Sequence, residues 1–283
     1  AGAAALVRQY FTEGWYPSGT LQPHNAFVPS GALLKAALLN STRDMTGTDA
    51  FGSAANINGY PTNIEGWGEL VLDDALYFSG DTRNLWVWDV RHSSGMNTGD
   101  SRNYAVNVTS NTQSLKITLV WTEPSPAAAG FGAPVINDLD LVAIAPNGDV
   151  FRGNDFTTGQ STVNGTAVDN VNNVEMVLVN APQVGQYTIQ VVGTAINEGN
   201  PGQGYALVVT ADTEDPPSPI GAQNTLVVRT GIPDIAAGAT PPLTTATNLM
   251  TTAGNYISQV SYGSTTVNPI FVETTLSQPS SFY

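Results

Sequence analysis

The sequence predicts a mainly β protein built around an antiparallel β-sandwich or jelly roll. From about residue 80 to residue 212, apolar and polar residues alternate in short runs, and turn residues separate these runs. No helical pattern interrupts them, which excludes alternating βαβ units. The composition agrees with this prediction, because the chain contains 28 glycines and 18 prolines and only 11% charged residues. Together these observations are typical of a turn-rich sandwich.

The expected strands follow one another at hairpin-like spacing. They cover residues 85–90, 104–108, 115–121, 138–144, 174–180, 186–192 and 205–211. The Pro146-Asn147-Gly148 segment is the clearest turn signal among them.

Two helices are expected before the sandwich. Residues 1–11 are rich in alanine and suit tight packing against a sheet or another helix. Residues 30–41 carry Leu33, Leu34, Ala37 and Leu38 at helical spacing, and Ser30 is a suitable N-cap. A loop rich in glycine and asparagine follows over residues 46–63, and a short helical turn is expected at 73–76.

The chain therefore divides into an α-rich segment (1–80), the sandwich (81–212), a proline-rich linker (213–223) and a partial α+β segment (224–283). In the last segment we expect strands at 226–229 and 265–272 and a helix at about 245–260. These elements form a poor independent core, because so few strands and helices bury little apolar surface.

Charge and cysteine content exclude several functions. Nine basic and 23 acidic residues give a net charge of −14, which disfavours nucleic acid and anionic membranes as partners. The sequence has no apolar run long enough to span a bilayer. Cysteine is absent, so thiol catalysis and disulfides are excluded, and the two histidines, His24 and His92, lie far apart. We expect a secreted, extracellular protein.

Acidic and amide side chains recur in the middle of the sandwich, between residues 137 and 175. Alternation places Asp138 and Asp140 on one face of a strand. The candidate cation ligands are Asn137, Asp138, Asp140, Asn154, Asp155, Asn173 and Glu175. Ca²⁺ takes six to eight hard oxygen ligands of this kind, so the sequence predicts bound calcium. The alternative is that these residues cap turns and strand ends through local hydrogen bonds.

Three stretches of the first 80 residues resemble the end of a subtilisin-like serine protease domain. They are A-G-A-A-A-L-V at 1–7, P-S-G-A-L-L-K-A-A-L-L-N-S-T at 29–42 and E-G-W-G-E-L at 65–70. The resemblance implies that residues 1–80 are the C-terminal remnant of an α/β catalytic domain. It also implies that the nucleophilic serine lies just before Ala1 and the catalytic Asp and His lie further upstream. No catalytic residue is therefore assigned within this chain.

The sandwich resembles the C-terminal jelly-roll domain of secreted alkaline subtilases, which is similar to the P domain of proprotein convertases. The matching stretches are V-I-N-D-L-D-L at 135–141, A-P-N-G at 145–148, G-N-D-F at 153–156, D-N-V-N-N-V-E at 169–175 and N-A-P at 180–182. This resemblance also implies calcium in the domain.

The tail bears a weaker resemblance to the start of secreted metallopeptidase domains of the gametolysin or immune-inhibitor-A type. It depends on residues 224–230 and 248–267, mainly on Asn255-Tyr256 and Ser261-Tyr262-Gly263. The family's zinc motif would lie beyond Tyr283. The alternative is an extra strand–helix–strand unit packed on the sandwich.

These observations predict a non-catalytic C-terminal portion of a secreted subtilisin-like endopeptidase. Its calcium-binding sandwich would stabilise an upstream catalytic domain that cleaves protein substrates. A remnant of such a domain exposes apolar helix faces. They are covered either by the upstream domain or by neighbouring copies, so an extracellular assembly protein derived from a protease is the alternative. A free-standing ligand-binding module is a third possibility, and no motif supports it.

Overall fold

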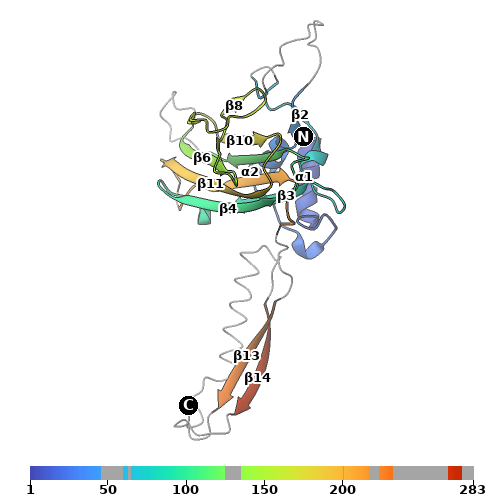
Figure 1. Cartoon of the computed structure of the whole chain (residues 1–283). Helices are drawn as coiled ribbons and strands as arrows, with labels where there is room; N and C mark the ends of the chain where they lie inside the picture. Colours follow the sequence, from blue (N-terminus) through green and yellow to red (C-terminus); the bar gives the residue numbers. More distant parts are fainter. Residues whose placement is uncertain are drawn as a thin grey trace.

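A computed structural model describes residues 1–45, 60–62, 65–124, 135–199, 201–216, 223–231 and 267–275 of the chain. Within these ranges the protein is mainly β, with two α-helices and antiparallel sheets (Figure 1). The predicted fold class is thereby confirmed.

Two four-stranded antiparallel sheets form the sandwich. The first sheet has the strand order β10-β5-β12-β3, and the second has the order β4-β11-β6-β7. The first sheet comprises β3 (Asn84–Val90), β5 (Leu115–Trp121), β10 (Val174–Val179) and β12 (Tyr205–Ala211). The second comprises β4 (Ser101–Val108), β6 (Asn137–Ile144), β7 (Val150–Arg152) and β11 (Gly185–Ile196). All seven predicted strands are present, whereas β7 was not expected.

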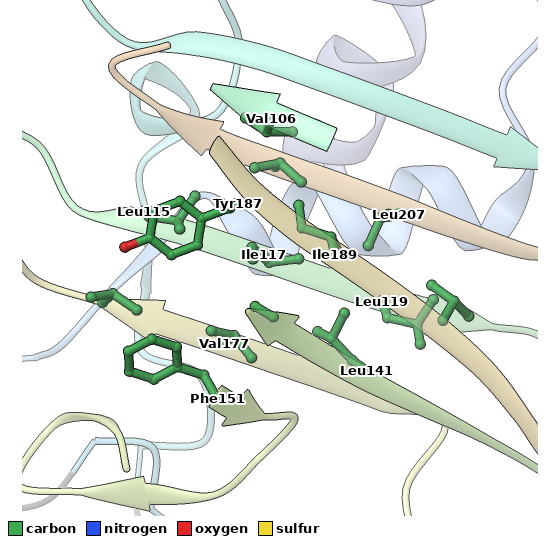
Figure 2. Close-up of a cluster of buried hydrophobic side chains, with 14 of the residues drawn as sticks. Val106, Leu115, Ile117, Leu119, Leu141, Phe151, Val177, Tyr187, Ile189 and Leu207 are labelled. Carbon is green, nitrogen blue, oxygen red and sulfur yellow. The ribbon is translucent and has the colours of Figure 1, made fainter. Parts of the chain in front are cut away.

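The main core fills the space between the two sheets. Alternate residues of β5 point inward, among them Leu115, Ile117 and Leu119, and they meet Leu141 and Ile189 of the opposite sheet (Figure 2). This period of two is the physical basis of the alternation in the sequence.

A second core lies on the other face of the first sheet, where the helices pack. Helix α1 (Gly2–Glu13) contributes Val7, Tyr10 and Phe11, and helix α2 (Gly31–Asn40) contributes Leu33 and small alanines. Outward-facing residues of β5 and β12 complete this core, so both strands are buried on both faces. Residues before position 80 therefore share a core with the sandwich strands.

The start of α2 follows the prediction from sequence. The Ser30 hydroxyl oxygen accepts a hydrogen bond from the backbone N–H of Leu33 at 2.9 Å, as an N-cap residue does. The Ser30 hydroxyl also donates to a carboxylate oxygen of Asp89 in β3 at 2.5 Å. The cap thus also ties the helix to the first sheet.

Short elements connect these layers. They are the 3-10 turns η1 (Pro23–Asn25), η2 (Leu72–Asp74) and η3 (His92–Ser94), and the paired strands β1 (Thr42–Arg43) with β2 (Glu69–Leu70) and β8 (Phe156–Thr157) with β9 (Gln160–Ser161). The helical turn expected at 73–76 is thus a 3-10 turn that begins one residue earlier.

In the last segment, β13 (Gln223–Gly231) pairs in parallel with β14 (Val267–Thr275). Both strands were expected, although each is longer than its pattern indicated. The helix at 245–260 lies outside the described residues, as do most of the loop at 46–63 and the linker between residues 217 and 222.

Candidate metal centre

The structure gives the seven predicted ligands different environments. Glu175, Asp138 and Asp140 interact electrostatically with one another, and Asp169 joins them. Asp169 belongs to the D-N-V-N-N-V-E stretch but was not among the predicted ligands. Its position at the start of that acidic and amide-rich stretch was the signal that could have identified it.

Glu175 is the second residue of strand β10 and is only 1% exposed. Its Oε2 accepts a hydrogen bond from the backbone N–H of Leu141 at 2.6 Å, across the edge of β6. Its Oε1 is buried and has no hydrogen-bond partner among the described residues. Gly153 lies directly against this carboxylate, and a Cβ atom there would be 2.1 Å from Oε2. A glycine at position 153 therefore leaves room for the carboxylate.

The pKa of Glu175 lies well above its ordinary value, mainly because burial penalises the charged form. The neighbouring carboxylates of Asp140, Asp169 and Asp138 raise this pKa further, and the Leu141 N–H opposes the shift. A nearby cation would stabilise the charged form of Glu175 and would offset the repulsion from the three carboxylates.

Asp138 and Asp140 lie on β6 with their side chains on the same face, as the alternation predicts. Burial raises the pKa of Asp138, and Asp140, Asp169 and Glu123 raise it further. The Oδ1 of Asp138 is a second buried oxygen without a partner among the described residues. Asp140 accepts a hydrogen bond from the Thr194 hydroxyl.

Asn154 and Asp155 organise the loop after β7. The Asn154 side-chain amide donates to Asp169 Oδ2 at 2.5 Å and to the Val174 carbonyl at 2.7 Å, and its oxygen accepts from the Met176 N–H at 2.9 Å. Asp155 Oδ2 accepts from the Ala167 N–H at 3.1 Å. A hollow of about 240 Å³ is lined by Asn154, Asp169 and their neighbours in this loop.

Asn137 and Asn173 make other contacts. The buried Asn137 amide donates to the Glu198 carbonyl and to Gln203 Oε1, both at 2.6 Å. Its oxygen accepts from the N–H groups of Asn197 and Glu198. Asn173 Oδ1 accepts from the Lys35 ammonium of α2 at 3.1 Å. Both residues therefore have hydrogen-bond partners from distant parts of the chain, whereas the alternative interpretation expected local partners.

In the part of the chain that the structure describes, no three acidic or histidine side chains are arranged to hold a metal ion directly. The chemistry of the set still suits a hard cation, because carboxylate and amide oxygens are what Ca²⁺ prefers. The two orphaned buried oxygens, on Glu175 and Asp138, are the observation that fits such an ion.

Neither histidine belongs to this set. His24 is exposed in η1. His92 is exposed in η3, where its Nδ1 accepts from the Gly204 N–H at 3.1 Å. Among the described residues, no helix has the length and apolar character to cross a bilayer.

The architecture is that of a β-sandwich carrying two helices on one sheet, and comparison with known proteins links it to proteases. Three proteins of Dictyostelium discoideum, named serine protease/ABC transporter B family proteins tagA, tagB and tagD, are 28%, 28% and 26% identical to 73%, 70% and 70% of this chain. The chain spans only 11–13% of their length. The chain is thus related to proteins named as serine proteases.

No family model matches the sequence. Among solved structures, the propeptide form of Bacillus licheniformis lipase BlEst2 is 13% identical, with a TM-score of 0.28, over 75% of this chain and 38% of the lipase. Aeromonas hydrophila PliG, a periplasmic inhibitor of g-type lysozyme, is 14% identical, with a TM-score of 0.24, over 47% of this chain and 89% of the inhibitor. These likenesses are too remote to bear on function.

Proposed function

We propose that this chain is the non-catalytic C-terminal portion of a secreted subtilisin-like serine endopeptidase, in which a calcium-binding sandwich stabilises the catalytic domain. The observation that carries the proposal is the similarity to proteins named as serine proteases over 70–73% of the chain. Peptide hydrolysis itself would take place on the upstream domain, by an acyl-enzyme route.

An apolar hollow on the helical side supports a packed interface with that domain. It measures about 410 Å³ and is lined by Leu6, Tyr10, Trp15, Leu72, Leu76 and Phe78, together with polar neighbours. Leu6 is 56% exposed and Phe78 is 38% exposed, which is costly for side chains of this size in water. The proposed occupant is the catalytic domain of the same polypeptide.

Asp138, Asp140, Asp169 and Glu175, which we call the carboxylate cluster, act on one another electrostatically without being arranged to hold an ion directly. Calcium binding would draw their carboxylates together. The bound ion would supply the positive charge that this cluster lacks and would connect the edge of β6 to β10 and to the loop after β7. Two hydrogen bonds already connect these elements. Glu175 of β10 accepts from the Leu141 N–H of β6, and the Asn154 amide after β7 donates to the Val174 carbonyl of β10.

Thermal unfolding of chelated protein tests the calcium part of the proposal. We expect the Tm to rise saturably with CaCl₂ and to change little with MgCl₂ at the same concentration, because only the folded state binds the ion. Glu175→Gln should remove the response, whereas the exposed Glu69→Gln on β2, which makes the same charge change, should retain it. No calcium response in the wild-type protein would contradict this part.

The protease part is tested on the protein purified from its source. We expect an intact mass above 29.6 kDa and covalent labelling by a fluorophosphonate, and no labelling of the recombinant 283-residue chain. A native protein that begins at Ala1 and forms concentration-dependent oligomers would favour the assembly alternative, in which copies of the chain cover the apolar hollow.

A further inference from the structure

A polar hollow of about 390 Å³ lies where the end of α2 and strand β1 meet the first sheet. Its lining includes Arg43, Arg83 and Lys116, which are three of the nine basic residues of a chain with a net charge of −14. We call this hollow the cationic pocket. It lies apart from the carboxylate cluster, since the residues that line it do not include any member of that cluster.

Lys116 is the most buried cation of the pocket. It is 6% exposed, and its ammonium donates to the Thr42 carbonyl oxygen. Among the described residues, no carboxylate lies within ion-pair distance of it. Burial lowers its pKa to about 8, and the nearby positive charges of Arg83 and Arg43 contribute to the shift, which Asp74 opposes. An ammonium has three donors, so Lys116 retains capacity for an anion.

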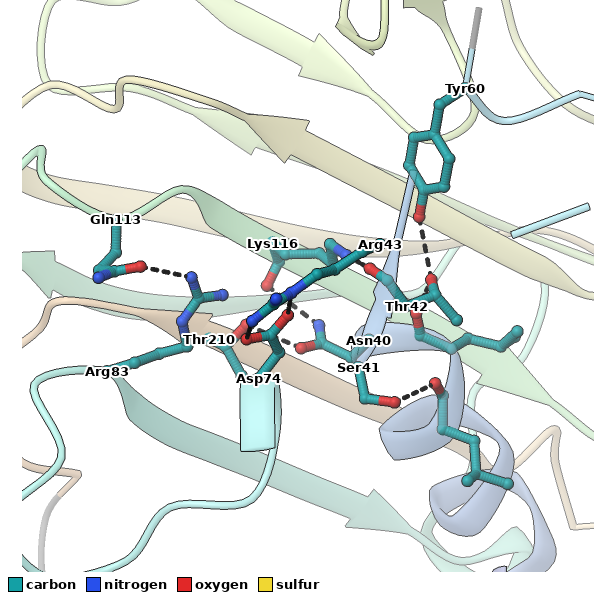
Figure 3. Close-up of polar contacts among 12 residues, drawn as sticks. Asn40, Ser41, Thr42, Arg43, Tyr60, Asp74, Arg83, Gln113, Lys116 and Thr210 are labelled. Carbon is teal, nitrogen blue, oxygen red and sulfur yellow. Dashed lines mark hydrogen bonds and ion pairs between the residues drawn. The ribbon is translucent and has the colours of Figure 1, made fainter. Parts of the chain in front are cut away.

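Arg83 is half-buried and also lines the pocket. Its Nη2 donates to Gln113 Oε1 at 2.7 Å, and burial lowers the pKa of its guanidinium. Arg43 is more exposed and pairs with Asp74. Figure 3 shows Arg43, Arg83 and Lys116 around Asp74, with Gln113 beside Arg83. A guanidinium has a planar fork of donors that matches a carboxylate.

We propose that the cationic pocket binds a ligand through a single carboxylate, held by Lys116 and Arg83 with Arg43 at the rim. Charge balance favours one negative charge. The lining holds three cations and the carboxylates of Asp44 and Asp74, so the lining itself carries one net positive charge. Outside the lining, Asp73 and Glu69 act on Arg43, and Asp212 acts on Arg83. A dianion such as phosphate would overcompensate that charge and would be repelled by both aspartates.

The rest of the lining indicates what such a ligand carries beside its carboxylate. Ser114, Gln113 and Asn180 offer hydrogen-bonding groups, and Tyr60 and Leu178 provide apolar contact. A small organic acid and the C-terminus of a peptide share this chemistry.

The test is a titration of the full chain followed by amide chemical shifts in NMR. The probes are acetyl-trialanine with a free carboxylate, its carboxamide, acetate and inorganic phosphate. We expect saturable shifts at the pocket with the free acid and binding of the carboxamide at least about tenfold weaker, because only the acid neutralises the cations. Acetate binding as tightly as the peptide acid would indicate a small acid as the ligand, and weaker acetate binding would indicate a peptide terminus.

Variants assign the binding to the pocket. Lys116→Met and Arg83→Gln should each weaken binding of the peptide acid about tenfold or more. Arg8→Gln, which removes an exposed charge from α1, should leave it unchanged. The comparison of acid with carboxamide uses the wild-type protein, so it holds even if a variant fails to fold. Equal binding of acid and carboxamide, tighter binding of phosphate, or the absence of saturable shifts would overturn the proposal.

Discussion

The environment of Glu175 departs from what the chemistry of a carboxylate requires. A buried carboxylate is stable when hydrogen bonds or a cation compensate for lost hydration. Glu175 has one donor, the Leu141 N–H, and three carboxylates nearby. Without a bound cation, the folded protein therefore favours the protonated form of this group more than the unfolded chain does.

This environment predicts how stability depends on pH in chelated protein. The pKa of Glu175 is raised in the folded state above its ordinary value of 4.5, so its protonated form stabilises the fold below pH 4.5. That contribution falls as the pH rises toward the higher folded pKa. We expect the wild-type free energy of unfolding in urea to decline, relative to that of Glu175→Gln, as the pH rises above the ordinary value of 4.5. The exposed Glu69→Gln should follow the wild type, and parallel pH profiles for wild type and Glu175→Gln would refute this account.

At the scale of elements, helix α2 is held on the first sheet by its last residue. The buried Asn40 amide donates to the Lys116 carbonyl at 3.2 Å and to the Thr118 hydroxyl at 3.1 Å, and its oxygen accepts from the Thr210 hydroxyl at 2.8 Å. One side chain thus bonds to both β5 and β12.

Asn40→Ala should lower the free energy of unfolding by about 1–3 kcal/mol, because it leaves buried polar partners unsatisfied. Denaturant unfolding measures this loss. The exposed Asn103→Ala on β4, which removes one surface hydrogen bond from Gln190, should cost much less. Equal losses would mean that the Asn40 contacts contribute little.

The elements themselves were largely predictable from the sequence, because their signals are local. Ser30 caps α2 by bonding to Leu33, three positions away. Apolar and polar residues alternate along most of the sequence of β5. The sites were less predictable, because they depend on distant pairs. The sequence around Asn137 does not reveal that its side-chain amide forms hydrogen bonds with residues between 197 and 203. Nor does the sequence place Arg43, Arg83 and Lys116 in one hollow.

For the whole molecule, the shared second core predicts the limits of the folding unit. Val7, Tyr10 and Phe11 of α1 are buried with strands of the first sheet, whereas β13 and β14 pair with each other. We expect a chain of residues 1–216 to unfold with the Tm of the full chain. Deletion of residues 1–13 should cost at least about 3–5 kcal/mol, since it empties part of a core. Calorimetry measures the Tm of both truncated chains against that of the full chain. An unchanged Tm after the N-terminal deletion would contradict a shared core.

Strands β3 and β12 lie side by side, with Asn84 opposite Ala211 at the end of their ladder. The chain therefore enters and leaves the sandwich at one corner. A pulling force transmitted along the polypeptide would open this pair like a zipper, from Asn84 and Ala211 onward, breaking its hydrogen bonds one after another. A ladder loaded in that direction yields at low force, because each bond alone contributes only about 1 kcal/mol. The strength of the sandwich against tension thus depends on what packs over that corner. Here α2 packs on β12, and both helices share a core with Leu85 of β3 and Val208 of β12.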